Sequence, residues 1–273
     1  MTDFNPDQRA LIGPQQDTSP SSTEVKSKLL RPILQFIAHF GVVSSYHVLY
    51  RFWTHKAKSP VYGWRLLKQI EDAGYITSGP IEPEKGNRSV KYLRLTQEGW
   101  ERISRSCPRE LKGPLPDAEL LYRIQYAEMA LIRSKEGFRE VSENRRMDAL
   151  KGWALAQFRN RHLSDSDLFR RTGIERLTSG RILNPIWLHT EKGLLRIVVP
   201  AIEGRTAGHS IRSLPDLKLF EYLSFEVVGV HQGSIEGVIR FLRRKSDSHF
   251  GHFEIHTAQH FSKRPNPRRA YKG

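Results

Sequence analysis

The chain has 273 residues, 38% of them hydrophobic, and its 44 Lys+Arg against 29 Asp+Glu give a formal net charge of +15. Such a length accommodates one large domain or two modest ones, and the positive excess indicates nucleic acid first, then an anionic membrane surface or acidic proteins. No apolar stretch approaches the ~18–20 residues of a membrane span. The single Cys107 excludes an intrachain disulfide and a cysteine-based zinc site. Since the first 30 residues also lack the apolar core of a signal peptide, we expect a cytoplasmic protein that interacts with nucleic acid.

Composition divides the chain into segments. Its beginning is poor in aliphatic residues and broken by Pro and Gly, as in disordered arms. The stretch PRELKGPLPD holds three prolines and one glycine in ten residues, which is typical of a linker. We therefore expect a disordered arm over 1–24, a first domain over 25–107, a linker over 108–116, a second domain over 117–260 and a basic tail over 261–273.

The first domain begins with two predicted helices. Apolar residues recur at three- and four-residue spacing from Leu29 to Phe40, which predicts an amphipathic helix that Gly41 ends. The stretch SSYHVLYRFW follows, and Ser44 or Ser45 is a suitable N-cap for a short second helix.

A third helix is predicted over SPVYGWRLLKQIEDAG. Pro60 is at the first helical position, where a backbone N–H would have no partner within the helix, so its missing N–H costs nothing. Gly74 is placed to end the helix. A projection at about 100° per residue separates two faces. One face is apolar and holds Gly63, Leu66, Leu67, Ile70 and Ala73, and the other holds Arg65, Lys68 and Asp72, flanked by Trp64 and Gln69.

The stretch after this helix predicts a strand from Ile76, a turn with Pro80, Pro83 and Gly86, a strand over Val90 to Leu95, and a helix capped by Thr96. Three helices followed by a β-hairpin is the order of a winged helix-turn-helix, in which the third helix enters the major groove and the hairpin touches the backbone. The expected DNA contacts are Lys56, Lys58, Tyr62, Trp64, Arg65, Lys68 and Gln69 on and before the third helix, and Lys85, Arg88, Lys91 and Arg94 on the hairpin.

A charged outer face is also what any solvated helix has, and Asp72 on this face would repel phosphate. The order of elements, the basic hairpin and the charge of +15 together favour DNA binding over that simpler interpretation.

The same region resembles the winged-helix pattern of many bacterial regulators. The segments that carry the likeness are RLLKQIEDAGYI and YLRLTQEGWERI, with a hairpin between them, and the likeness covers roughly residues 26–106.

The second domain is expected to be an α/β sheet domain, which makes the whole chain α+β. A helix is predicted over Ala118 to Ser134, then a short strand in FREVSEN and helices in RRMDALKGWALAQFRN and DSDLFRR. Strands follow in ILNPIWLHT, LLRIVVPAI, PDLKLF and YLSFEVVGV, then a helix in SIEGVIRFLRRK with Ser234 as its cap, and a strand in HFEIHTA.

This order is similar to the PD-(D/E)xK nuclease fold, in which a helix precedes three strands, a helix and a strand. Pro215 and Asp216 stand at the PD of the motif and Glu226 at its second acid. The resemblance implies that Asp216 and Glu226 could hold Mg²⁺. Val228 occupies the lysine position, so we expect a nuclease-like scaffold without catalysis.

A winged helix joined to a degenerate nuclease-like domain resembles the replication-relaxation proteins of plasmids and integrative elements. The short motifs that carry this likeness are LRLTQEG and LPDLKLF…FEVV. The likeness implies a role in plasmid replication or conjugative mobilisation, with recruitment of other replication, transfer or transcription proteins.

Other signals are weaker. His249, His252, His256 and His260 would stack on a helix and suggest a metal site, but the apolar alternation there predicts a strand. HTEKG is expected to be a β-turn. No phosphate-cradling glycine-rich loop is present, so we expect no nucleotide and no other cofactor.

The leading hypothesis is a sequence-specific double-stranded DNA-binding protein, either a transcription regulator or a replication or mobilisation accessory factor. The alternatives are a metal-dependent DNA nuclease using Asp216 and Glu226, and an adaptor that binds protein through the winged helix. A homodimer would set the spacing of DNA half-sites, but no segment identifies its interface.

Overall fold

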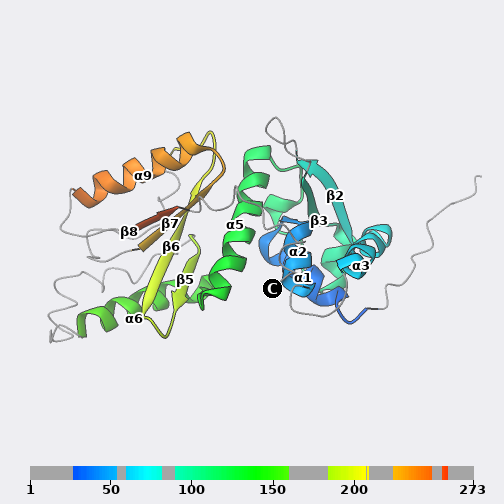
Figure 1. Cartoon of the computed structure of the whole chain (residues 1–273), viewed down its shortest axis with the longest axis horizontal. Helices are drawn as coiled ribbons and strands as arrows, with labels where there is room; N and C mark the ends of the chain where they lie inside the picture. The colour runs from blue at the N-terminus through cyan, green and yellow to red at the C-terminus, as the bar shows by residue number, and fades with distance from the viewer. Residues whose placement is uncertain are drawn as a thin grey trace, which may run out of the picture.

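The computed structural model describes residues 27–53, 60–81, 90–159, 184–206, 208, 224–247 and 254–257. It is a mixed α+β structure, as expected. Figure 1 shows α5 between two halves, with α1, α2, α3 and the β2–β3 hairpin on one side and the sheet under α9 on the other. The expected arm, basic tail and DSDLFRR helix and the PDLKLF strand lie outside the described residues.

The first half has the predicted helices and hairpin. Its elements are α1 (Leu30–Phe40), β1 (Val43–Ser44), α2 (Ser45–Trp53), α3 (Pro60–Asp72), β2 (Ile76–Ile81), β3 (Val90–Leu95) and α4 (Gln97–Arg102). Gly41 ends α1 with a positive φ of 74° and donates its N–H to the carbonyl of Ile37, because glycine adopts this left-handed conformation without steric cost. The Thr96 hydroxyl accepts the N–H of Gly99 and caps α4.

The strands of this half form an antiparallel sheet in the order β1-β3-β2. The hairpin register pairs Ile76 with Leu95 and Ile81 with Val90. Val43 pairs with Leu93, which adds the short strand β1 that the sequence pattern did not predict. Leu93 and Leu95 are buried against α1 and α4, so one face of the sheet covers the helical core.

The expected linker is packed against the first half. Residues Arg109–Leu111 form a short 3₁₀ helix, and Leu111 is buried in the same apolar cluster as Ile33 and Ile37. Apolar burial of this kind ties the segment to the core, so it is part of the folded structure.

The second half is built on a mixed sheet. Its elements are α5 (Asp117–Lys135), β4 (Arg139–Val141), a 3₁₀ turn (Glu143–Arg145), α6 (Arg146–Arg159), β5 (Ile186–His189), β6 (Leu194–Ala201), β7 (Ser224–Gly229), α9 (Gln232–Asp247) and β8 (Glu254–Thr257). The sheet order is β4-β5-β6-β7-β8. The first two pairings are antiparallel and the last two are parallel. A helix therefore precedes β5, β6 and β7, and α9 and β8 follow.

Alternate residues of these strands enter two cores. Val198 and Val228 join the cluster that contains Ala127 and Met129 of α5, whereas Ile197 and the other residues of its parity pack with α9 and α6. One face of the sheet thus meets α5, and the other meets α9 and α6. Because the first cluster also contains the core of α1 and α2, α5 belongs to both halves.

Several details of the second half bear on the sequence predictions. The helix α9 begins at Gln232, so Ser234 lies inside it, and the prediction that Ser234 is its N-cap is wrong. His256 lies on strand β8, in agreement with the strand interpretation, while His249, His252 and His260 lie outside the described residues. The HTEKG segment forms a turn with Gly193 at a φ of 60°. Over the described ranges, none of the helices combines the length and apolar character that crossing a membrane requires.

Candidate nucleic-acid interface

The helix α3 packs closely against α2 at a glycine. A β-carbon added at Gly63 would stand 2.5 Å from Cδ2 of Leu49 and 3.0 Å from the ring of Trp53, so a larger residue here would require these side chains to shift. Leu66, Leu67 and Ile70 of α3 are buried in the core. The opposite face of α3 is consequently turned to solvent at the end of the molecule away from α9 (Figure 1).

The solvent-facing side chains of α3 are those predicted from its helical projection. Arg65, Lys68 and Gln69 are exposed, and Trp64 is exposed to 41%. Arg65 and Gln69 have no side-chain hydrogen bond or ion pair within the part of the chain that the structure describes. Their donors and acceptors are therefore available to another molecule, at positions one helical turn apart.

Aromatic residues gather at the N-terminal end of α3. Tyr62 is exposed to 46% and its ring lies 6.4 Å from that of Trp53. Trp64 meets Tyr46 of α2 edge to face, with ring centroids 5.7 Å apart. Tyr46 and the neighbouring Val61 are also exposed, and the sequence analysis did not assign either of them. The position of Tyr46 on α2, beside the stripe of buried apolar residues, could have indicated that its ring is exposed.

The acidic residue on the outer face of α3 has a partner on the same helix. Asp72 forms an ion pair with Lys68, with 2.7 Å between a carboxylate oxygen and Nζ, and both side chains are more than half exposed. The hydrogen bond and charge of Asp72 raise the pKa of Lys68. Water and salt screen an exposed pair of this kind, so it adds little to stability, and Lys68 can exchange Asp72 for a phosphate at small cost.

The two described basic residues of the hairpin point to different faces. Lys91 is exposed on β3, opposite Pro80 of β2. Arg94 is on the other face, and its guanidinium donates hydrogen bonds to the carbonyls of Leu111 and Gly113, the latter at 3.0 Å. Arg94 thus anchors the segment after α4, and this differs from the phosphate contact that we expected. The predicted contacts Lys56, Lys58, Lys85 and Arg88 lie outside the described residues.

Glu226, one of the two carboxylates of the nuclease alternative, is paired with two arginines. Glu226 is 1% exposed, and its two oxygens accept from Nε and a terminal nitrogen of Arg133 at 2.9 and 2.6 Å. Arg196 donates to it as well, at 3.0 Å. Burial alone would lower the pKa of Arg133, but its hydrogen bonds to Glu226 and Glu136 raise it, so the guanidinium of Arg133 stays charged.

The rest of the nuclease motif is not assembled in the described structure. Val228, at the position of the motif's lysine, is fully buried against α5. Asp216 lies outside the described residues. Within the described ranges no three His, Cys, Asp or Glu side chains are grouped closely enough to hold a metal ion.

Comparison of the chain with protein-family models, with curated proteins and with solved structures gives no match.

Proposed function

We propose that the protein is a sequence-specific double-stranded DNA-binding protein that reads the major groove with the outer face of α3. The proposal rests on the exposed hydrogen-bonding groups of Arg65 and Gln69, which have no partner among the described residues. They lie beside Lys68 in a chain with a charge of +15. The order α1, α2, α3 and hairpin agrees with a winged helix-turn-helix, and the proposal takes that fold for the first half.

The dimensions of α3 suit this role. Its 13 residues span about 20 Å, and the major groove of B-form DNA, about 12 Å wide, admits one helix. Arginine pairs with guanine through two hydrogen bonds and glutamine with adenine. Arg65 and Gln69 are separated by a rise of about 6 Å, so they would read bases about two steps of 3.4 Å apart. Lys91 on the hairpin would contact phosphate, which adds affinity without sequence information.

The biological role within this proposal is a transcription regulator or an accessory factor of plasmid replication or conjugative mobilisation. Its partner would be double-stranded DNA in the cytoplasm, with no cofactor. The second half would then serve as a scaffold, since Glu226 is held in ion pairs with Arg133 and Arg196.

A capture experiment tests the proposal. The purified full chain is mixed with sheared genomic DNA of its source at ~0.15 M salt, near physiological ionic strength, and the bound fragments are sequenced. We expect a small number of sharp peaks that share a motif, and peaks beside an origin rather than a promoter would identify the replication or mobilisation role. Even coverage, equal to that of the input, would contradict sequence-specific binding.

A further inference from the structure

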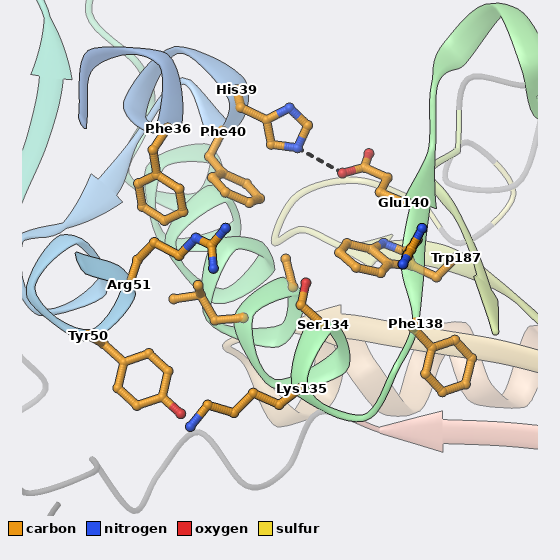
Figure 2. Close-up of a pocket in the computed structure, with 13 residues that line it drawn as sticks. Phe36, His39, Phe40, Tyr50, Arg51, Ser134, Lys135, Phe138, Glu140 and Trp187 are labelled. Carbon is orange, nitrogen blue, oxygen red and sulfur yellow. Dashed lines mark hydrogen bonds and ion pairs between the residues drawn. The ribbon is translucent and has the colours of Figure 1, made fainter. Parts of the chain in front are cut away.

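A pocket of about 530 Å³ lies between the two halves of the molecule. Side chains of α1 and α2 form one wall, and α5, β4 and β5 supply the rest (Figure 2). Pockets that bind small organic molecules have volumes of about 300–1,000 Å³ and often lie at such junctions. The size and place of this pocket therefore suit a small ligand.

The apolar part of the lining is aromatic. Phe36 and Phe40 meet edge to face on α1, with ring centroids 5.2 Å apart. Trp187 of β5 lies across the pocket from them (Figure 2). The indole N–H of Trp187 donates to the hydroxyl of Tyr126 at 3.3 Å, which leaves its ring as an apolar surface. Aromatic rings prefer edge-to-face or offset contacts with other rings, so a planar ligand would be favoured here.

The polar part of the lining carries more positive than negative charge. The cationic side chains are Arg51, Lys135 and Arg139. Arg51 points into the pocket in Figure 2, and its guanidinium has no partner among the described residues. Lys135 lies over the ring of Tyr50, with Nζ 4.3 Å from its centre.

The one carboxylate of the lining is already engaged. Glu140 is 2.8 Å from Nε2 of His39 and 3.7 Å from a guanidinium nitrogen of Arg146. In Figure 2 the His39–Glu140 pair is at one edge of the pocket. The remaining charge in the pocket is therefore positive, and an anion would meet the guanidinium of Arg51, which has no partner in the described part of the chain.

From this combination we propose that the pocket binds a small free organic anion with a planar aromatic body, of the aromatic carboxylate class. Its carboxylate pairs with Arg51, because a guanidinium presents two parallel N–H donors to a carboxylate. Its ring lies against the aromatic lining of Phe36, Phe40 and Trp187. This site is separate from the outer face of α3 and does not depend on DNA binding.

Calorimetric titration of the full chain without DNA tests the site, with 2-naphthoate as the probe and 2-naphthol as its uncharged counterpart. We expect one naphthoate per chain and binding of naphthol at least about tenfold weaker, since the charged hydrogen bonds are lost. Equal affinities for the two compounds, or no heat of naphthoate binding up to millimolar concentration, would overturn the proposal. Inorganic phosphate that binds as tightly as naphthoate would overturn the aromatic part of it.

Substitutions locate the site. Arg51→Gln should weaken naphthoate at least about tenfold, whereas Arg31→Gln, which removes an exposed arginine of α1 outside the pocket, should leave it unchanged. Lys135→Gln serves as a second variant if Arg51→Gln does not fold, as judged by thermal unfolding. The indole N–H resonance of Trp187, identified by its loss in Trp187→Phe, should shift on naphthoate binding.

Two results with these variants would contradict the site. The first is equal naphthoate affinity in the Arg51 and Arg31 variants. The second is a loss of DNA affinity in Arg51→Gln with naphthoate binding intact, because Arg51 would then contact phosphate of DNA and not a free anion.

Discussion

Arg133 of α5 binds both carboxylate oxygens of Glu226 on β7, at 2.9 and 2.6 Å. These residues are 93 positions apart in the chain, and Arg196 of β6 completes the arrangement at 3.0 Å. The pairing joins α5 to the sheet at the face where Val198 and Val228 also pack on it. A carboxylate that the sequence suggested as a metal ligand thus has a structural role.

The first prediction concerns this ion-pair cluster. Glu226→Ala should lower the free energy of unfolding by about 3 kcal/mol, because it removes the shared counter-charge of two largely buried guanidinium groups, of which Arg133 retains the more exposed Glu136. Urea denaturation measures the change. Glu236→Ala, on the exposed surface of α9, should change stability by less than about 0.5 kcal/mol. A loss below about 1 kcal/mol in Glu226→Ala would show that the cluster does not stabilise the fold.

The second prediction uses one substitution at two glycines. Gly63→Ala should destabilise the protein by about 1–3 kcal/mol, since the new methyl group overlaps Leu49 and Trp53. Gly152→Ala on α6 meets no atom within 4 Å, so it should stabilise the protein by about 0.5–1 kcal/mol through the better helix propensity of alanine. Thermal unfolding of both variants checks the opposite signs, and equal shifts would contradict the close packing of α2 on α3.

The third prediction concerns the acid on α3. Asp72→Asn should tighten binding to any duplex several-fold, because it releases Lys68 and removes a charge that repels phosphate. The same substitution at Asp148, on α6 at a distance from α3, should have a much smaller effect (Figure 1). Anisotropy titrations of a labelled duplex measure both. Equal gains in the two variants would mean that net charge alone, and not the α3 face, determines the affinity.

The fourth prediction concerns alkaline pH. Burial raises the pKa of Tyr122 and of Tyr126 above the ordinary value of a tyrosine, which is about 10. The unfolded chain loses these protons first as pH rises above ~10, so stability present below that pH is lost, by about 1.4 kcal/mol per pH unit for each tyrosine. Urea denaturation between about pH 9 and 11 checks this, because that range spans the ordinary tyrosine pKa of about 10. The decline should be shallower in the double Tyr→Phe variant, and an unchanged slope would contradict the burial of these hydroxyls.

Local patterns were sufficient to predict the helices and the hairpin of the first half. The apolar spacing before Gly41, and the placement of Pro60 and Gly74, depend on residues within a few turns of one another. The same helical projection indicated which side chains of α3 face solvent. Such features are predictable because backbone geometry alone determines which residues of a helix share a face.

Features that depend on distant partners could not be predicted in this way. Strand β1 exists because Val43 pairs with Leu93, and two residues carry too little periodicity to signal a strand. Arg94 is a cationic hairpin residue of the kind that contacts phosphate, but its guanidinium donates to backbone carbonyls of the segment after α4. The proline-rich composition suggested a linker, and the burial of Leu111 depends on contacts with the core. Tertiary contact decided each case.

The most direct test of DNA reading by α3 is an anisotropy titration across a salt series, with the duplex found by capture and a shuffled duplex of equal composition. The variants are Arg65→Ala, Lys91→Ala and Arg240→Ala, each of which removes one exposed positive charge, and Arg240 lies on α9 far from α3 (Figure 1). Arg65→Ala should weaken binding to the captured site by about 1–3 kcal/mol with little change on the shuffled duplex. Lys91→Ala should weaken both about equally and reduce the salt slope by about one, and Arg240→Ala should change neither. Equal losses on both duplexes for Arg65→Ala, or a loss as large for Arg240→Ala, would contradict the assignment of α3 as the reading helix.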